Sequence, residues 1–508
     1  MKILSREQIQ EADRYTIDNE PIPSIDLMDR ASKAFCDEFL NDFYPPDTNT
    51  VFVFAGKGNN GGDGLAISRL LLIVGFEVRT FILEPEPKSG SPDFETNLQR
   101  LQDIPGASIE KLTPESELPN LPKDSVIIDA IFGTGLSRPI EGFIGQVVSH
   151  IRDNSDHSTV VAVDIPSGLF CDEHNPDDTK VPADLTYTFQ VPKYAFFIPD
   201  SGAFAGRFKV LDIGLCPDFL KSAYTNIHYL TEDEVPLIRP RQIFSHKGDY
   251  GRILIAGGSY GKIGAPALSI KATLKTGGGL VTGFIPECGY TAIQSSIPEA
   301  MVMTSGDETH LTDKEIDPSQ FDALAIGPGL DTHSRAWGAL EALLEKSSEP
   351  LVLDADALNI LAAKPELFEK VPAQSILTPH PGEFSRIAGK ADNGFEQIER
   401  ASELAHKHQL NLLLKGAYSV LITPKDQRFF NSTGNPGMAS GGSGDVLTGI
   451  LASLLARGLA PDQAGLLGMY IHGISGDYAA YEKGEEGMTA TDIIEALPKA
   501  MMQVKKKP

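Results

Sequence analysis

Two series of short apolar segments that alternate with helical segments constrain the fold of this chain most strongly. In the first half the apolar runs are Val51–Phe54, Val78–Leu83, Val126–Ile128 and Val160–Val163. Stretches with helical periodicity lie between several of them, for example Leu65–Val74 and Ile144–Ile151. Continuous apolar strands that alternate with helices indicate a parallel sheet covered on both faces. We therefore predict a three-layer α/β/α domain.

A second series of the same kind follows a segment rich in proline and acidic residues. That segment, Cys216–Ser245, is interpreted as the connection between two domains. The strands expected beyond it are Arg252–Ala256, Leu280–Ile285, Ala323–Ile326, Leu351–Leu353, Ser375–Leu377, Leu412–Leu414 and Ser419–Ile422. Because 508 residues exceed what one hydrophobic core usually organises, we predict two α/β/α domains, over residues 1–218 and 226–505.

The composition argues against several classes of partner. The net charge of −25 repels nucleic-acid backbones and anionic membranes. No apolar run approaches the roughly 18 residues that span a bilayer, and the N-terminus lacks an apolar signal core. The four cysteines form no disulfide framework or metal-ligand spacing. These features predict a cytoplasmic protein that binds neither nucleic acid nor membrane. As separate expectations, the protein acts on small molecules and forms a homo-oligomer.

A glycine-rich loop follows the first expected strand. Its glycines at positions 56, 58 and 61 satisfy G-x-G-x-x-G between a strand and a helix expected from Leu65. A Rossmann dehydrogenase is one interpretation, but the next strand ends without a convincing ribose-binding carboxylate. A tight packing turn would explain the glycines alone. The loop also carries three polar side chains, which favour a binding function: Asn59, Asn60 and Asp63.

Two further expected strands end in aspartate. Asp129 precedes the loop Gly133–Pro139, and Asp164 precedes Ser167. A single aspartate in this position often only caps the next helix. Because the carboxyl ends of parallel strands meet at one edge of a sheet, three polar loops together predict a ligand crevice.

These three motifs resemble the NAD(P)H-hydrate epimerase family across the first half of the chain. The resemblance implies a Rossmann-like domain in which Asp164 is the acid/base that inverts the hydrated carbon through ring opening and closure. It implies K⁺ held by the oxygens of Asn60, Asp129 and Ser167. The residues that would bind the hydrated dinucleotide are Asn59, Asn60, Gly61, Gly62, Asp63, Gly133, Thr134, Gly135, Leu136, Ser137, Arg138, Pro139 and Asp164. Some members carry a lysine where this chain has Ser137 and Arg138, so no lysine role is transferred.

The second half contains a glycine-rich loop before an apolar helix. The segment Asn431–Asp445 holds five glycines and is followed by Val446–Leu455. Free N–H groups at a helix N-terminus bind anions, and Gly441, Gly442 and Gly444 would let phosphate approach. Aspartate is favourable in the first turn of any helix, yet the glycines exceed what capping needs. We predict a phosphoryl-transfer site with Asp445 as its base.

This Gly-Gly-Ser-Gly-Asp loop is similar to the catalytic loop of ribokinase-like enzymes. With His246–Gly251, Gly257–Pro266, Thr378–Glu383 and Lys415–Ser419, it resembles the NAD(P)H-hydrate dehydratase family. The resemblance implies Mg²⁺, ADP as co-substrate, and contacts to the hydrated cofactor from Ala265, Gly329, His380 and Asp445. The implied nucleotide contacts are Lys415, Gly416, Ala417, Tyr418, Ser419 and Gly444. Roles for Glu383, Asp354 and Asp356 stay open, and His472 is expected to pack within a helix.

Together these resemblances imply one bifunctional enzyme, an isomerase and a lyase. Hydration of NADH or NADPH gives R and S forms; the first domain would interconvert them. The second would dehydrate the S form, converting ADP to AMP and phosphate, whereas eukaryotic dehydratases use ATP. A vitamin or sugar kinase would leave the first domain without a role. A non-enzymatic scaffold is the other alternative, and the intact Asn60, Asp129 and Asp164 argue against it.

Overall fold

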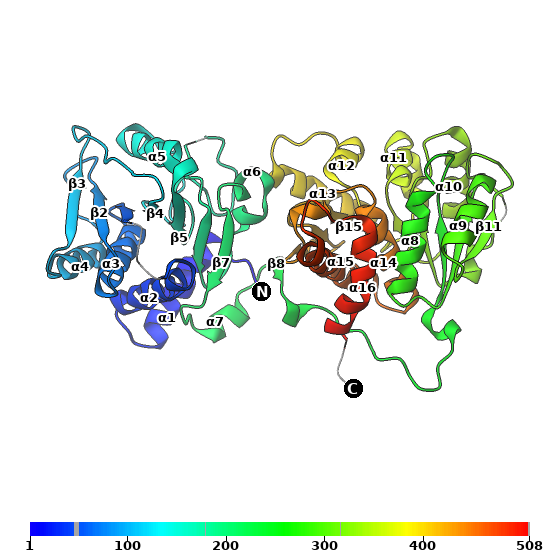
Figure 1. The fold of residues 1–508 in the computed structure, drawn as a ribbon, viewed down its shortest axis with the longest axis horizontal. Coiled ribbons are helices and arrows are strands. Elements are labelled where there is room, and N and C mark those ends of the chain that lie inside the picture. Colours follow the sequence, from blue (N-terminus) through cyan, green and yellow to red (C-terminus); the bar gives the residue numbers. More distant parts are fainter. Residues whose placement is uncertain (45–49, 178, 315, 506–508) are drawn as a thin grey trace. The chain divides into compact units, whose positions relative to one another are not determined.

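The computed structural model describes residues 1–44, 50–177, 179–314 and 316–505 (Figure 1). The chain forms two compact units. The N-terminal unit is Lys2–Thr225, and the C-terminal unit is Asn226–Pro508 together with Met1. Among the described residues, no helix combines the length and the apolar character needed to cross a membrane.

The N-terminal unit is built on a seven-stranded parallel sheet with the order β3-β2-β1-β4-β5-β6-β7. Its strands are β1 (Val51–Ala55), β2 (Val78–Leu83), β3 (Ser108–Leu112), β4 (Val126–Ala130), β5 (Thr159–Val163), β6 (Leu185–Phe189) and β7 (Arg207–Leu211). Its helices are α1 (Arg6–Asn19), α2 (Ser24–Phe43), α3 (Asn59–Ile73), α4 (Pro92–Gln102), α5 (Gly142–Asn154), α6 (Pro199–Gly202) and α7 (Pro217–Ser222).

The side chains of β1 point alternately to the two faces of this sheet, and they are buried on both. Val51 and Val53 belong to a core cluster that includes residues of α2 and α3. Phe52 and Phe54 belong to another cluster, which includes residues of α5. Figure 1 shows α5 on the opposite side of the sheet from α2 and α3. A strand buried on both faces reads as a continuous apolar run, which is why the sequence predicted it.

The C-terminal unit contains a ten-stranded sheet with the order β11-β10-β9-β12-β13-β14-β15-β16-β17-β8. Neighbouring strands are parallel except around β16, which is antiparallel to β15 and β17. The strands are β8 (Ile227–Leu230), β9 (Arg252–Ala256), β10 (Leu280–Ile285), β11 (Met301–Thr304), β12 (Ala323–Ile326), β13 (Val352–Leu353), β14 (Ile376–Leu377), β15 (Asn411–Leu414), β16 (Val420–Ile422) and β17 (Arg428–Asn431).

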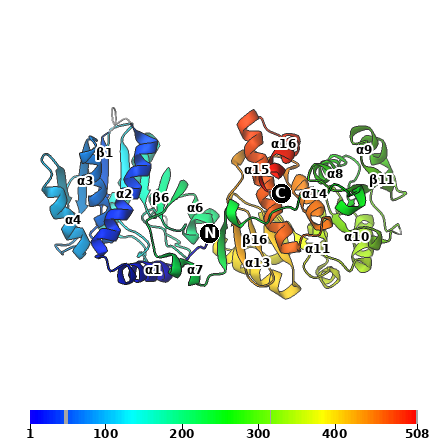
Figure 2. The ribbon, with the colours of Figure 1, turned by 90° about the horizontal axis from the view of Figure 1, so that it is seen from below.

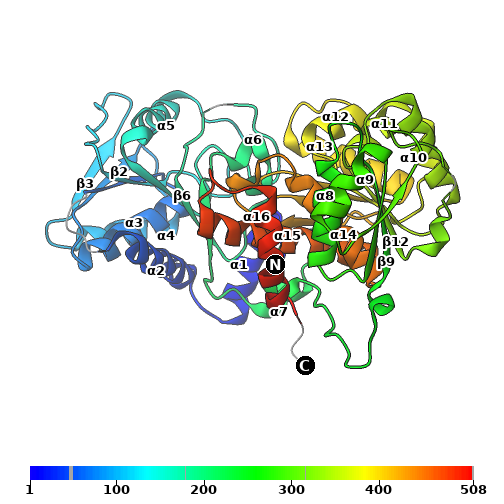
Figure 3. The same cartoon turned by 45° about the vertical axis from the view of Figure 1, so that its right-hand side comes forward.

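Helices cover both faces of the second sheet as well. They are α8 (Gly264–Lys275), α9 (Tyr290–Ser296), α10 (Ser334–Lys346), α11 (Asp356–Ala363), α12 (Pro381–Ala388), α13 (Gly394–His408), α14 (Ser443–Ala456), α15 (Pro461–Lys483) and α16 (Ala490–Gln503). Figure 3 shows α8, α14, α15 and α16 together, and their buried residues share one core cluster with Ile253 and Ile255. Figure 2 shows α10, α11 and α13 on the other side of the sheet from α15 and α16. The predicted fold class, two α/β/α layered units, is confirmed.

The segment Cys216–Ser245 differs from the connection that its composition predicts. It contains α7, whose Phe219 ring lies 5.5 Å from the ring of Tyr15 in α1. It also contains β8, which pairs with β17 at the edge of the second sheet. The division between the units falls inside this segment, between Thr225 and Asn226. Prolines and acidic residues are tolerated here because an edge strand and a short helix need little apolar sequence.

Candidate active sites in the two units

The glycine-rich loop of the N-terminal unit is largely part of a helix. Helix α3 begins at Asn59, not near Leu65 as expected. A Cβ atom added at Gly61 would lie 1.7 Å from the carbonyl oxygen of Gly56, and one at Gly64 would lie 2.5 Å from Ala130 Cβ. These glycines let the first turns of α3 pack against the ends of β1 and β4. The polar residues among them are therefore fixed at the carboxyl edge of the sheet.

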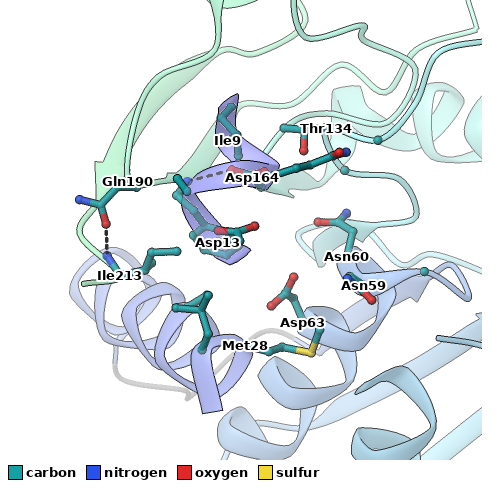
Figure 4. A pocket seen from close by; sticks show the side chains of 18 of the residues that line it. Ile9, Asp13, Met28, Asn59, Asn60, Asp63, Thr134, Asp164, Gln190 and Ile213 are labelled. Atoms are coloured by element: carbon teal, nitrogen blue, oxygen red, sulfur yellow. Dashed lines mark hydrogen bonds between the residues drawn. The ribbon is translucent and has the colours of Figure 1, made fainter. Parts of the chain in front are cut away.

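A cavity of about 760 Å³ lies at this edge, and we call it the N-terminal cavity (Figure 4). It is lined by residues of α1, α2 and α3 and of the segments that follow β1, β4, β5, β6 and β7. The structure brings ten of the predicted dinucleotide-binding residues into its wall: Asn59, Asn60, Asp63, Gly133, Thr134, Gly135, Leu136, Ser137, Arg138 and Asp164. Predicted site residues outside that lining are Gly61, Gly62, Asp129, Pro139 and Ser167.

Asp164 is held by a buried ion pair. It follows β5 with a φ of 66°, a left-handed conformation that aspartate tolerates better than most residues. Its Oδ1 accepts a hydrogen bond from Phe189 N at 2.9 Å and lies 2.6 Å from Lys193 Nζ. Lys193 is fully buried and also donates to the carbonyl oxygens of Phe189 and Val191. The sequence analysis missed Lys193, although a lysine among the apolar residues after β6 was a detectable signal.

Two further carboxyl groups line the same cavity. Burial raises the pKa of Asp63 well above its usual value, and the charges of Asp164 and Asp13 add to the effect. Burial and the charge of Asp164 raise the pKa of Asp13 to about 6, against the opposing charge of Lys193. Sites that place carboxyl groups in contrasting environments can supply both a base and an acid. Asp13 was not predicted, because nothing in its local sequence separates it from a surface aspartate.

The predicted cation ligands lie partly together. The Asp129 carboxylate is fully buried and accepts hydrogen bonds from Ser167 N at 2.7 Å and Ser167 Oγ at 2.6 Å. Asn60 lies against Gly133, where an added Cβ atom would be 3.3 Å from Asn60 Oδ1. The buried Asn60 Nδ2 has no hydrogen-bond partner among the described residues. The Asp129 carboxylate forms no ion pair with a described residue.

The C-terminal unit places Asp445 in the first turn of α14. The helix follows Gly442, whose φ of 93° is in the left-handed region that glycine favours. A Cβ atom at Gly449 would lie 2.1 Å from the carbonyl oxygen of Ser269, so only glycine allows α14 to approach α8 this closely. Ser269 Oγ also donates to the carbonyl oxygen of Asp445 at 2.8 Å. Close helix packing thus fixes the loop that sequence analysis identified.

Asp354, whose role the sequence left open, joins Lys415 to this helix. Lys415 Nζ lies 2.6 Å from Asp354 Oδ1, and Thr448 Oγ1 donates to Asp354 Oδ2 at 2.6 Å. A Cβ atom at Gly444 would lie 2.9 Å from Lys415 Nζ. Two predicted nucleotide-binding residues therefore meet at the N-terminus of α14. The ammonium group adds positive charge where the helix already favours anions.

The carboxyl group of Asp445 lies in an acidic environment. Burial, together with the negative charges of Asp354, Asp356 and Glu383, raises the pKa of Asp445 to about 7 against the opposing charge of Lys415. A carboxyl group with such a pKa can exchange a proton near neutral pH. Nearby, burial lowers the pKa of His472 to about 4.

The remaining predicted contacts of this unit lie on loops at strand ends, except Ala265, which lies in the first turn of α8. Gly329 has a φ of 63°, and an added Cβ atom would be 3.2 Å from Ala265 Cβ, so these two residues are neighbours. His380 precedes α12, where its Nδ1 accepts from Gly382 N at 3.0 Å. Glu383 completes this cap by accepting from His380 N at 2.9 Å, which gives both residues a structural role. The loop between β15 and β16 carries the other predicted nucleotide contacts, Gly416, Ala417, Tyr418 and Ser419.

Both halves of the chain match known families. The sequence model described as NAD(P)H-hydrate dehydratase matches residues 253–499, and that of the YjeF-related protein N-terminus matches residues 24–195. The bifunctional NAD(P)H-hydrate repair enzyme Nnr of Moorella thermoacetica is 38% identical over 98% of this chain and 96% of its own length. The chain belongs to the family of bifunctional NAD(P)H-hydrate repair enzymes. The Escherichia coli member is 33% identical over 97% of this chain and 92% of its own length.

Two solved structures of bacterial proteins are similar to part of this chain. The ADP/ATP-dependent NAD(P)H-hydrate dehydratase of Bacillus subtilis is 30% identical, with 56% of this chain and 100% of that chain covered and a TM-score of 0.49. A ribokinase-like superfamily protein of Enterococcus faecalis is 27% identical, with 56% and 98% covered and a TM-score of 0.48. Membership of the repair-enzyme family rests on the full-length sequence relatives.

Proposed function

We propose that this chain restores hydrated NADH and NADPH to the intact cofactors by two successive reactions. The N-terminal unit, predicted over residues 1–218, interconverts the R and S hydrates. The C-terminal unit, predicted over residues 226–505, dehydrates the S form and converts ADP to AMP and phosphate. The observation that supports the proposal is that each unit holds a carboxyl group at a strand or helix end in its candidate site, Asp164 in one and Asp445 in the other.

In the N-terminal unit, Asp164 acts on the hydroxyl group of the hydrated ring. Its carboxylate takes the hydroxyl proton while the bond between that carbon and the ring nitrogen breaks, which leaves an aldehyde. Rotation presents the other face of the carbonyl group, the nitrogen attacks it again, and Asp164 returns the proton. Lys193 holds Asp164 Oδ1 in place at 2.6 Å throughout.

In the C-terminal unit, Asp445 acts as the base for phosphoryl transfer. It takes the proton of the substrate hydroxyl as the oxygen attacks the terminal phosphorus of ADP, and AMP leaves. Phosphate then leaves from the ring carbon, and the neighbouring carbon loses a proton as the double bond re-forms. The N–H groups at the start of α14, together with Lys415, bind the phosphate charge.

Both predicted cations suit the residues present. Asp129 is a buried carboxylate without a cationic side chain beside it among the described residues, so K⁺ held by Asp129, Ser167 and Asn60 would balance its charge. K⁺ would order the loops that contact the dinucleotide. In the C-terminal unit, the carboxyl groups of Asp356 and Glu383 lie near Asp445. Carboxylates of this kind would hold Mg²⁺ together with nucleotide phosphates, and the ion would withdraw charge from the transferred group.

Location and assembly remain predictions. The substrates are soluble intracellular cofactors, and all four cysteines are free, which favours a cytoplasmic enzyme. We also propose a homo-oligomer without nucleic-acid or membrane partners, which light scattering and binding measurements on the purified chain would test.

The test uses the full chain with a mixture of R and S hydrates of NADPH. The absorbance of the reduced ring is followed with Mg²⁺ and K⁺ present, and with ADP, ATP or no nucleotide. We expect absorbance to return with ADP, one AMP and one phosphate appearing for each NADPH. No return with either nucleotide would refute the proposal. Return with ATP alone would refute only the choice of ADP.

A further inference from the structure

Helix α1 brings a carboxyl group to the wall of the N-terminal cavity that faces the predicted dinucleotide loop. Asp13 lies one helical turn from both Ile9 and Ile17, and all three residues line the cavity. Figure 4 shows Asp13, Asp63 and Asp164 around the same open space. A residue from a helix far from the strand-end motifs thus shares a site with Asp164.

The local structure gives Asp13 no stabilising partner. Helix α1 is capped by Ser5 and Gln8, so Asp13 is not needed to begin the helix. Its side chain forms no hydrogen bond or ion pair within the described part of the chain. A half-buried carboxyl group without a partner costs stability, and such groups concentrate at functional sites.

The surroundings of Asp13 suit an acid, whereas those of Asp164 suit a base. The charged groups that face Asp13 across the cavity are Asp164, Lys193 and Asp63. Lys193 Nζ pairs directly with Asp164 Oδ1 at 2.6 Å, whereas Asp13 forms no ion pair with this lysine. Burial and the charge of Asp164 raise the pKa of Asp13 to about 6.

Apolar side chains line the cavity near Asp13. Ile9 and Ile17 lie one turn away on α1, and Ile213 and Leu215 share a core cluster with Ala12, whereas Asn59, Asn60 and Asp63 belong to α3. An uncharged ring fits an apolar wall, and sugar and phosphate groups fit the polar loop. The reacting ring would therefore lie between Asp164 and Asp13.

We propose that Asp13 is the proton donor to the ring nitrogen during epimerisation, opposite Asp164 as the base; this rests on the function proposed above. As Asp164 takes the hydroxyl proton, the bond between the hydrated carbon and the nitrogen breaks and its electron pair goes to nitrogen. The Asp13 carboxyl group gives its proton to that nitrogen. In ring closure the nitrogen attacks the other carbonyl face, Asp13 takes the proton back, and Asp164 protonates the oxygen. Nothing is consumed.

The test measures interconversion of purified R hydrate of NADPH by the full chain without nucleotide, by chromatographic separation of the two forms across pH. In the wild type, kcat/KM should fall as pH rises through the pKa of Asp13, about 6 in the free protein. Asp13→Asn should slow interconversion by about 10²-fold or more and abolish that alkaline fall, because a general acid contributes about 10²–10⁴. Asp13→Glu, which retains an acid, should keep the alkaline fall.

Two comparisons separate this role from a structural one. Asp18→Asn removes the same charge from an exposed position of the same helix and should leave interconversion unchanged. Thermal unfolding of the N-terminal unit of Asp13→Asn should occur at or above the wild-type temperature, which shows that the unit carrying the substitution folds. An Asp13→Asn rate within twofold of the wild type, an intact alkaline fall in that variant, or its loss in Asp63→Asn instead would overturn the inference. A wild type unable to interconvert the hydrates would refute the proposed function itself.

Discussion

Lys193 Nζ lies 2.6 Å from Asp164 Oδ1, and the lysine side chain is completely buried. Asp164 itself retains 12% of its side-chain exposure, on the side of the N-terminal cavity. The pair thus fixes the carboxylate from behind and leaves it open to a ligand in front. A buried ion pair of this kind adds little net stability, but the loss of one partner is costly. This asymmetry favours a positioning role for Lys193.

Replacement of Lys193 by methionine should destabilise the N-terminal unit by about 3–5 kcal/mol, because it leaves Asp164 buried without its partner. Thermal or denaturant unfolding of that unit measures the effect. The matched control is Lys209→Met, which removes a lysine that is 39% exposed and paired with Glu38 and Asp42. That change should cost less than about 1 kcal/mol. Equal losses in the two variants would contradict a special role for the buried pair.

Replacement of Asp445 by asparagine should slow dehydration of S hydrate by about 10²–10⁴-fold, because the N-terminus of α14 offers only N–H donors and cannot accept a proton. ADP should still bind, and epimerisation should be unchanged. Asp462→Asn is the control, since it alters an exposed aspartate in the first turn of α15. Near-normal dehydration by Asp445→Asn would remove Asp445 as the base, and loss of ADP binding and epimerisation together would indicate misfolding.

The two activities should respond to pH in opposite directions. Asp445 must be deprotonated to act as a base, and its pKa is raised to about 7 by burial and neighbouring carboxylates. The kcat/KM for dehydration should therefore fall about tenfold for each pH unit below that value. Epimerisation should instead fall as pH rises through the pKa of Asp13. A dehydration profile that is flat between pH 5 and about 7 would contradict the assigned base.

Division of the chain between Thr225 and Asn226 should give two soluble fragments, because this is where the compact units meet in sequence. The first should epimerise without nucleotide, and the second should dehydrate only S hydrate. A second fragment that starts after Ser245 is the control. It lacks β8, whose Ile227 to Leu230 pair with β17, so it should be less stable than the longer fragment. Equal use of both epimers by the second fragment would contradict the division of activities.

The sequence predicted the central strands and their terminal aspartates well, for one physical reason. Strands buried on both faces are continuous apolar runs, and Val78–Leu83 and Arg252–Ala256 have the predicted bounds. The edge strands β3, β7, β8 and β11 were missed, and so were β6 and β17 inside the sheets. In β3 the apolar pattern is broken because Glu110 and Lys111 are exposed to solvent.

The candidate sites were predictable where their residues form a local pattern or follow a recognisable strand, as Asn60, Gly133 and Asp164 do. Asp445 and the glycines before it form a local pattern, and α14 begins where that pattern predicts. Asp13 and Lys193 join Asp164 only in the folded structure, and Asp354 meets Lys415 in the same way. The start of α3 was misplaced because glycines that serve close packing look the same in sequence as glycines of a loop.

The central claim is that one chain passes a substrate through two reactions, and pure R hydrate of NADPH tests it most directly. With ADP, Mg²⁺ and K⁺, the wild type should return all of the R hydrate to NADPH, measured by the absorbance of the reduced ring. Asp164→Asn should return S hydrate at the normal rate but R hydrate only as fast as the epimers interconvert spontaneously. Recovery of R hydrate by Asp164→Asn at the wild-type rate, or no recovery by the wild type, would contradict the account.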